Sequence, residues 1–192
     1  MLTCKTGLNA PANFLEQVYA IDKAVYSPEL CGALENLVIR YERCPDTYLL
    51  IYDGDTLAGY LCFLPIGEGL YAQLTDPADH TMRDDDIAPS EMEPWRQEQP
   101  NHLFILSVAV MPAYRGGEAI RLLGNSFLQF LREKAADGYP IGSLSGSAVS
   151  SGGENFLKRF GGVFQKEVAG GYRYHLANQK QVEDVLRNGL IL

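Results

Sequence analysis

The residues in this sequence that could bind an anion form the run Arg115-Gly116-Gly117, which precedes an amphipathic pattern. A helix that begins at a glycine pair has backbone N–H groups without internal partners, and the positive end of its macrodipole attracts negative charge. Glycine has no Cβ, so a phosphate can approach the backbone closely. The run therefore favours a phosphate or pyrophosphate site, and the alternative is a structural turn between a strand and a helix.

The elements around this run must position it. Residues 103–110 are apolar on both alternating faces apart from Ser107, which predicts a central strand covered on both sides. Met111 and Pro112 end this strand, because proline has no N–H and restricts the residue before it. After Gly117, apolar residues recur at steps of three and four and predict a helix that packs back on the strand. They are Ala119, Ile120, Leu123, Phe127, Phe130 and Leu131.

The rest of the chain alternates helical and strand patterns. The second helix is expected to face inward through Leu30, Leu34, Leu37 and either Ile39 or Val38. Residues 65–74 suggest a short strand or turn. The other expected elements are a strand at 2–6, helices at 11–25 and 29–43, a hairpin of 47–52 and 56–64, a strand at 140–149 parallel to 103–110, a helix at 154–159 capped by 150–153, a hairpin of 163–168 and 172–176, and a helix at 179–187.

The composition fits one domain spanning residues 1–192, because 192 residues with 46% hydrophobic content can bury one sizeable core. The four cysteines form no CxxC pair, so we expect reduced thiols and neither a metal site nor a disulfide framework. The N-terminal residues lack a signal-peptide pattern, and no apolar run is long enough to span a bilayer. We therefore expect a cytoplasmic protein without a membrane partner.

The formal net charge of −8 argues against a nucleic-acid partner, since phosphate backbones are held by clustered Lys and Arg. Residues 71–100 alone carry a net charge of −6. We expect a long acidic loop at about 71–101, and leave open whether it is a solvated or disordered loop or lines a substrate site. Asp84, Asp85 and Asp86 lack the spacing of a calcium loop, but they could attract a cationic amine.

The sequence VxPxYRG, formed here by Val110 to Gly116 after the apolar strand, resembles the signature of the GNAT N-acetyltransferase superfamily. The later run FLKRFGG resembles the family's LYEKLGF segment, with Gly161 matching. The motifs cover residues 108–123 and 156–161, and the expected element order matches the family over the whole chain. The resemblance implies an α/β GNAT fold, with a mixed central sheet flanked by helices on both faces.

In that family, the Q/RxxGxG/A loop holds the pyrophosphate of CoA through backbone amides. Arg115 takes its first position, with Gly116 and Gly117 as the variable ones. Glu118 then stands at the first required glycine and Ile120 at the small final position. If the loop is one residue shorter, Gly117 and Ala119 take these roles. We prefer the shorter loop, because it keeps small residues where the phosphate approaches.

The resemblance also implies that the backbone amides of Val108 and Val110 polarise the thioester carbonyl, where the strand splays from its parallel neighbour. The family's usual proton donor is the tyrosine of LYEKLGF, and this sequence has Leu157 there. A base often comes from the start of the buried strand, where His102 lies; its ordinary pKa of about 6.5 suits proton removal near neutrality. The alternative is an exposed histidine at the start of a strand.

These observations predict an N-acyltransferase that moves an acetyl group from acetyl-CoA, its co-substrate, to an amine of a small molecule or protein. A cationic acceptor is favoured by the acidic segment. The alternative is a GNAT-fold protein that binds acyl-CoA, or regulates through it, without efficient transfer. A nucleotide-binding kinase fits poorly, because no lysine follows the glycines. A homodimer is left open by the sequence.

Overall fold

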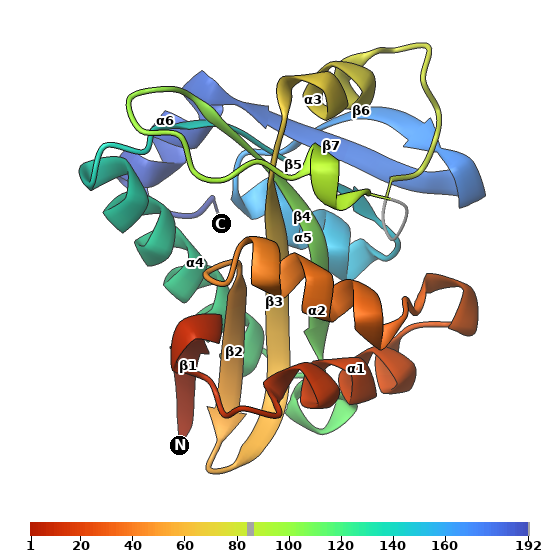
Figure 1. Ribbon diagram of the computed structural model, residues 1–192, viewed down its shortest axis with the longest axis vertical. Helices are drawn as coiled ribbons and strands as arrows, with labels where there is room; N and C mark the ends of the chain where they lie inside the picture. Colours follow the sequence, from red (N-terminus) through yellow and green to blue (C-terminus); the bar gives the residue numbers. More distant parts are fainter. Residues whose placement is uncertain (84–86, 192) are drawn as a thin grey trace. The chain divides into compact units, whose positions relative to one another are not determined.

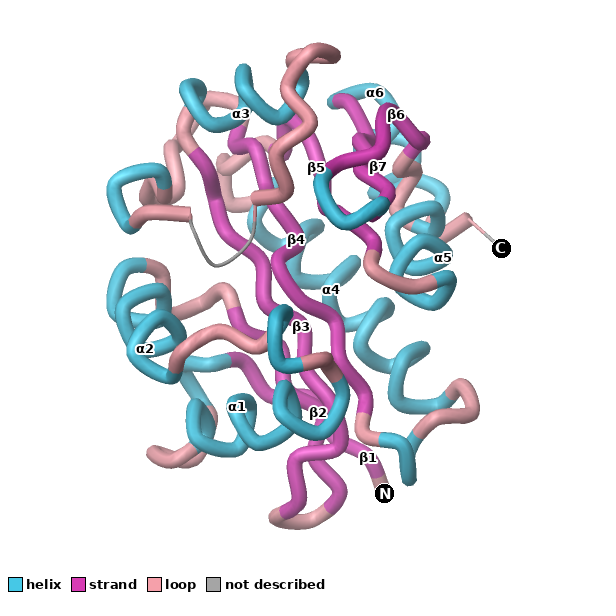
Figure 2. Tube along the Cα trace, turned by 90° about the vertical axis from the view of Figure 1, so that its right-hand side faces the viewer, coloured by secondary structure: helices cyan, strands magenta, loops and turns pink. Residues whose placement is uncertain are grey.

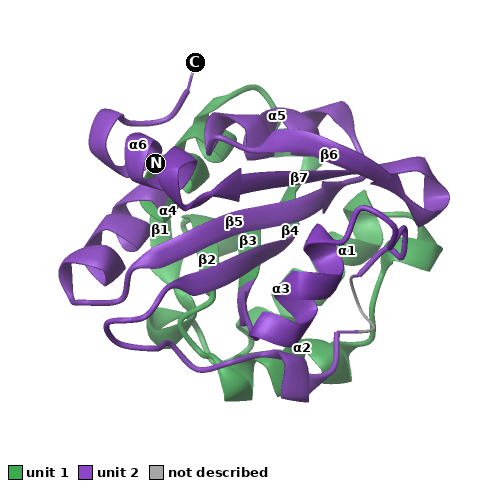
Figure 3. Cartoon of the chain, turned by 90° about the horizontal axis from the view of Figure 1, so that it is seen from above, with its two compact units in different colours: residues 1–63, 107–127 green, residues 64–106, 128–192 purple. Residues whose placement is uncertain are grey.

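The computed structural model describes residues 1–83 and 87–191 (Figure 1). The chain forms two compact units, which we describe separately (Figure 3). Unit 1 contains Met1–Phe63 and Ser107–Phe127, and unit 2 contains Leu64–Leu106 and Leu128–Leu192. This division does not test the expectation of a single domain, which stays a prediction.

Unit 1 is built on an antiparallel arrangement of strands. β1 (Leu2–Thr6) pairs with β2 (Tyr48–Asp53), and β2 pairs with β3 (Thr56–Ile66). The β2–β3 hairpin turns at Gly54, which has a φ of +59° and confirms the predicted turn. The end of β4 (Asn101–Val110) lies beside β3, because the N–H of Met111 donates to the carbonyl of Ala58 at 2.9 Å.

The helices of unit 1 cover both faces of these strands. α1 (Phe14–Val25) and α2 (Leu34–Arg43) lie on one face, and the first half of α4 (Glu118–Ala136) lies on the other (Figures 1 and 2). The rings of Phe14, Tyr41 and Tyr48 meet edge to face, with centroids 5.0 to 6.3 Å apart. The inner stripe predicted for α4 is largely confirmed, since Ala119, Leu123, Phe127 and Leu131 are fully buried.

Two predictions about the N-terminal helices were wrong in detail. The second helix begins at Leu34 and not at Glu29, because residues 28–30 form a separate 3₁₀ turn led by a proline. Its buried face contains Leu37 and Arg40, whereas Val38 and Ile39 are exposed. The inner face of the helix runs through residues 37 and 40, which are three positions apart, and residues 38 and 39 between them turn to the exposed side. The first helix begins three residues later than expected, at Phe14.

Unit 2 contains the start of β4 and three further strands. β4 pairs in parallel with β5 from Asn101 to Phe104, as predicted. β5 (Ile141–Ala148) pairs antiparallel with β7 (Tyr172–Asn178), which pairs antiparallel with β6 (Val163–Val168). The order of neighbouring strands in the sheet is β1-β2-β3-β4-β5-β7-β6. This mixed sheet with helices on both faces confirms the predicted α/β fold class.

The helices of unit 2 lie on both faces of its strands, with α5 (Ser151–Arg159) and α6 (Gln179–Asn188) on one and α3 (Glu68–Thr75) on the other (Figures 2 and 3). α5 begins at Ser151, three residues earlier than predicted, and its cap is Ser150 alone, whose hydroxyl accepts from the N–H of Gly153 at 3.2 Å. The prediction of a short strand or turn at 65–74 holds only for residues 65 and 66, which end β3, and was wrong from Glu68 onward, where α3 begins. Leu70 and Leu74 are one helical turn apart and both buried, and this stripe outweighs the nearby glycines.

The acidic segment is tied to the rest of unit 2 at several points. Its first residues, 71–75, belong to α3 and not to a loop. Further along, the carbonyl of His80 accepts from the N–H of Ala169 at 2.8 Å, and the N–H of Glu98 donates to the carbonyl of Gly138 at 2.8 Å. Arg83 forms a two-pronged ion pair with Glu91 at 2.6 and 2.8 Å. The described residues of this segment are therefore ordered by specific contacts, whereas Asp84, Asp85 and Asp86 lie outside the described residues.

None of the described helices is long and apolar enough to cross a membrane. All four cysteines are free thiols, and two of them, Cys44 and Cys62, are buried.

Candidate functional site

The candidate phosphate loop lies in unit 1, between the end of β4 and the start of α4. A 3₁₀ turn, Pro112–Tyr114, follows β4 and leads to Arg115. Gly116 and Gly117 have φ values of +140° and +117°, a region that residues with a Cβ rarely adopt. The sequence therefore needs glycine at both positions to turn the chain from strand into helix.

The backbone after these glycines offers free donors. The first backbone hydrogen bond of α4 joins the N–H of Arg121 to the carbonyl of Gly117 at 3.0 Å. The N–H groups of Glu118, Ala119 and Ile120 precede it and have no partner within the helix. Apart from each glycine's neighbours in the chain, no heavy atom of the described residues lies within 4 Å of where a Cβ of Gly116 or Gly117 would stand, so the two glycines are open to an approaching group.

A pocket of about 380 Å³ lies against this loop, entirely within unit 1. Its wall includes the loop residues and one strand carboxylate: Asp53, Tyr114, Arg115, Gly116, Glu118 and Ala119. The backbone donors and the Arg115 guanidinium suit a pyrophosphate, whereas the carboxylates of Asp53 and Glu118 oppose it. The residues present therefore offer donors for a CoA pyrophosphate, with a local electrostatic cost from the two carboxylates.

The local geometry bears on the two alignments of the loop. Gly117 directly precedes the first helical residue, Glu118, whose side chain is exposed, and Ala119 is fully buried. A carboxylate that turns to solvent leaves the small residues at 117 and 119 closest to the backbone turn. This arrangement favours the shorter loop, and the assignment of its cofactor contacts stays a prediction.

The end of β4 presents a free backbone edge next to the loop. Met111 bonds to β3 through its N–H, and backbone groups alternate between the two edges of a strand. The amides of Val108 and Val110 therefore point away from β3. On that edge, the Arg115 Nε donates to the carbonyl of Val110 at 3.3 Å. The described pairing of β4 with β5 ends at Phe104, consistent with the expected role of Val108 and Val110.

A hydrogen-bonded chain that the sequence analysis did not predict reaches this edge within unit 1. The Tyr26 hydroxyl can donate its one proton to the carbonyl of Val108, 3.1 Å away, or to the Ser107 hydroxyl, 2.9 Å away. Ser107 lies 2.7 Å from the hydroxyl of Tyr60, which donates to the Asp22 carboxylate. Burial, and then the Asp22 charge, raise the pKa of Tyr60 well above its ordinary value. Two signals could have pointed here, namely a serine in an apolar strand and Asp22 on the apolar face of a helix.

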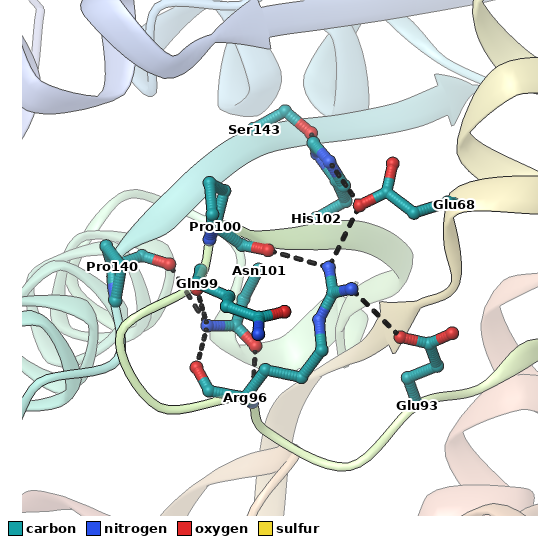
Figure 4. Close-up of polar contacts among 9 residues, drawn as sticks. All are labelled: Glu68, Glu93, Arg96, Gln99, Pro100, Asn101, His102, Pro140 and Ser143. Carbon is teal, nitrogen blue, oxygen red and sulfur yellow. Dashed lines mark hydrogen bonds and ion pairs between the residues drawn. The ribbon is translucent and has the colours of Figure 1, made fainter.

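His102, the predicted base, lies in unit 2 at the start of β4 (Figure 4). Its Nδ1 lies 2.9 Å from the Ser143 hydroxyl and its Nε2 lies 3.5 Å from the Glu68 carboxylate. Its ring stacks on Tyr71 at a centroid distance of 3.7 Å. It is only 9% exposed, so the alternative of an exposed histidine was wrong. Its role as a base stays a prediction.

The surroundings of His102 are a network of charges and amides (Figure 4). Arg96 contacts the Glu68 carboxylate at 3.0 Å and the Glu93 carboxylate at 3.5 Å. The Asn101 side chain accepts from the N–H of Arg96 at 2.8 Å and donates to the carbonyl of Pro140 at 3.1 Å, which fixes the start of β4. Burial lowers the pKa of His102, and the Glu68 charge opposes this shift.

The structure also bears on the residue at the family's tyrosine position and on possible metal-binding groups. Leu157, at the family's usual tyrosine position, is buried in unit 2, and its side chain contributes no proton donor. Among the described residues, no group of three or more His, Cys, Asp or Glu side chains is arranged to hold a metal ion.

The comparisons with known proteins agree with this fold. The chain resembles the loading GNATL domain of CurA from Lyngbya majuscula, with a TM-score of 0.68, 12% identity, and coverage of 94% of this chain and 98% of that one. A GNAT-like decarboxylase, GphF, in complex with isobutyryl-CoA gives 0.65 and 14% identity, covering 93% and 99%. PaiA N-acetyltransferase from Thermoplasma acidophilum, in complex with coenzyme A, gives 0.58 and 12%, covering 93% and 99%.

A search of curated protein sequences found no match. A family model, described as the acetyltransferase (GNAT) family, matches residues 15–139. The matched segment is more than half of the chain and contains both β4 and the glycine loop. The chain therefore belongs to the acetyltransferase (GNAT) family.

Proposed function

We propose that this protein transfers an acyl group, in the first instance acetyl, from acyl-CoA to an amine. The observation that carries the proposal is the glycine loop. Two glycines with positive φ stand immediately before α4, after the short turn that follows β4, inside the segment that the family model matches. The free amides of that turn and the Arg115 guanidinium would hold the pyrophosphate of the co-substrate.

The chemistry requires a polarised carbonyl and a neutral amine. The backbone amides of Val108 and Val110 would polarise the thioester, because they point to the edge of β4 opposite β3. Oriented N–H donors stabilise the oxyanion that develops when the amine attacks the carbonyl carbon. The thiol of CoA then leaves with one proton, and the product is an amide.

The acceptor would be an amine of a small molecule or protein. The net charge of −8 and the acidic segment that follows α3 support a cationic acceptor and argue against nucleic acid. Of that segment, the aspartates at 84–86 are outside the described residues, so the support rests on charge alone. A cytoplasmic location, the absence of a membrane partner and a homodimer are expectations from the sequence.

A second function is favoured by one observation. Leu157 replaces the tyrosine that the family uses as proton donor, and it is buried. The similar structures include one named an N-acetyltransferase and one named a decarboxylase, so this fold alone does not fix the reaction. A protein that binds acyl-CoA without efficient transfer is therefore the alternative.

Two measurements on the purified chain separate these functions. Calorimetric titration with CoA and acetyl-CoA tests binding, and release of free thiol from acetyl-CoA tests transfer. The amines would be a polyamine, an aminoglycoside, a lysine-containing peptide and a peptide with a free N-terminus. Binding with amine-dependent thiol release supports the acyltransferase, and binding without it supports the alternative. Absence of binding contradicts both.

A further inference from the structure

The hydrogen-bonded chain in unit 1 has a defined direction. Tyr60 donates its only hydroxyl proton to the Asp22 carboxylate. The contact between Tyr60 and Ser107 must therefore use the Ser107 proton. Because the Ser107 proton is used in that contact, the contact between Ser107 and Tyr26 must use the Tyr26 proton. The Tyr26 hydroxyl has one proton and two acceptors, the Ser107 oxygen at 2.9 Å and the Val108 carbonyl at 3.1 Å. When that proton lies on the nearer Ser107, every hydroxyl in the chain points its proton toward Asp22.

Burial separates one end of this chain from the other. Asp22 is 7% exposed and Tyr60 is 1% exposed, whereas Ser107 and Tyr26 are both half-buried. Tyr26 is the half-buried member at the end of the chain opposite Asp22, so a bound molecule would reach the chain through it. Its hydroxyl also contacts the carbonyl of Val108, on the same edge of β4 as the amides of Val108 and Val110.

We propose that Tyr26, Ser107, Tyr60 and Asp22 form a proton relay that accepts the proton of the attacking amine, with Tyr26 as the catalytic residue and the other three as positioning residues. The inference rests on the proposed acyl transfer and names the base for it. The raised pKa of Tyr60 suits this role, because a tyrosine that stays protonated passes a proton on without carrying a charge.

The relay balances the reaction. The amine nitrogen bonds to the acyl carbon, and the π electron pair of the carbonyl moves to its oxygen. The surplus proton on nitrogen passes to the Tyr26 hydroxyl oxygen while the protons of Tyr26, Ser107 and Tyr60 each move one step, and Asp22 becomes neutral. When the carbonyl reforms, the C–S bond breaks and its electron pair leaves on sulfur. The reverse transfer from Asp22 through Tyr26 protonates the thiolate and restores the relay.

The reverse step also supplies the proton that the leaving thiolate needs. The family takes this proton from the tyrosine whose position is Leu157 here. Tyr26 would act as base in the first half of the reaction and as acid in the second, because the proton that it takes from the amine is the one that it later gives to the thiolate.

The test measures thiol release from acetyl-CoA with the amine that gives the highest rate in the panel above. Tyr26→Phe should lower kcat by about 100-fold or more, the usual contribution of a general acid or base, while the Kd for CoA stays within about twofold, since the lost hydroxyl makes no proposed contact with CoA. Tyr19→Phe is the matched control, because Tyr19 is a half-buried tyrosine of α1, as is Tyr26 at the C-cap of that helix, and the Tyr19 ring contacts Lys23. It should keep the wild-type kcat.

Ser107 distinguishes proton transfer from shape. Ser107→Ala breaks the relay and should lower kcat as far as Tyr26→Phe does, whereas Ser107→Thr keeps a hydroxyl and should retain most of the rate. The double variant Tyr26→Phe/Ser107→Ala should be no slower than either single variant, because both interrupt one path.

The contrary results are distinct. A wild-type kcat in Tyr26→Phe, or equal losses in Ser107→Ala and Ser107→Thr, overturns the relay while leaving acyl transfer intact. Loss of CoA binding in Tyr26→Phe also overturns it, because the residue would then be part of the binding site. Wild-type protein that releases no thiol with any amine of the panel overturns the proposed function and the relay together.

Discussion

The two glycines of the loop allow the CoA site to be tested with a control in the same unit. Gly54, Gly116 and Gly117 all have positive φ, and an added Cβ meets no other atom within 4 Å at any of them. An alanine at each position therefore costs backbone strain alone. Gly54, with a φ of +59°, lies where alanine is disfavoured by about 1 kcal/mol. Gly116 and Gly117, at +140° and +117°, lie outside that region, and we expect costs of about 1–3 kcal/mol.

The stabilisation by CoA separates strain from lost binding. At a CoA concentration 100 times Kd, the free energy of unfolding rises by about 2.7 kcal/mol. If Gly116→Ala or Gly117→Ala turns the amides away and weakens binding tenfold, the same CoA concentration adds only about 1.4 kcal/mol. Gly54→Ala lies in the β2–β3 turn, so the full increment should remain.

The assay is urea denaturation of each variant with and without CoA, because it yields the free energy of unfolding directly. The quantity compared is the increment caused by CoA, so any loss of intrinsic stability cancels. Equal increments in all three variants would refute the reasoning, since the amides after Gly117 would then have no part in holding the pyrophosphate.

Three further predictions concern single side chains. Glu118→Gln should tighten CoA binding by about two- to fivefold, or about 0.5–1 kcal/mol, because it removes an exposed negative charge near the pyrophosphate. Calorimetry at 1 M salt should show a smaller gain in affinity, because the Debye length falls to about 3 Å. Leu157→Tyr should lower the free energy of unfolding by about 1–3 kcal/mol through overpacking. Leu157 is buried, and one of its methyl groups lies 3.1 Å from where a Cβ of Gly146 would stand. A variant as stable in urea as the wild type would show that the site has room for the larger side chain. Burial lowers the pKa of His102, so as pH falls the unfolded state binds this proton before the folded state does, and the free energy of unfolding should fall below about pH 6.5. Urea denaturation at several pH values should show a weaker fall in His102→Gln. An identical fall in the variant and the wild type would contradict this linkage.

Long periodic patterns allowed most of the fold to be predicted. The apolar run at 103–110, the stripe from Ala119 to Leu131 and the Asp-Gly-Asp turn each depend on local spacing, and each element formed where expected. α3 was missed because its eight residues contain one glycine and follow another, and a stripe of only two leucines is too short to distinguish a helix from a turn. The start of α2 was misplaced because a 3₁₀ turn resembles the first turn of a helix.

The candidate site was predictable where it depends on neighbouring residues. The glycine loop is contiguous in sequence, so its composition indicated its backbone geometry. The chain from Tyr26 to Asp22 was not, because the Tyr26–Ser107 contact joins residues 81 positions apart. Only the pairing of β3 with the end of β4 brings Tyr60 and Ser107 together, and that pairing depends on tertiary packing that no local pattern contains.

Gly59 shows how this pairing places the relay. A Cβ at residue 59 would stand 2.7 Å from the carbonyl oxygen of Ala109 and 3.1 Å from a methyl group of Val110, so only glycine lets β3 approach β4 this closely. The next residue, Tyr60, can then bring its hydroxyl to 2.7 Å from Ser107. On β4 itself, the Ser107 side chain meets the buried tyrosine while the amides of Val108 and Val110 point to the edge opposite β3. One strand thus carries the relay hydroxyl of Ser107 and the backbone amides that would polarise the thioester, because neighbouring residues of an extended chain direct their side chains and backbone groups alternately.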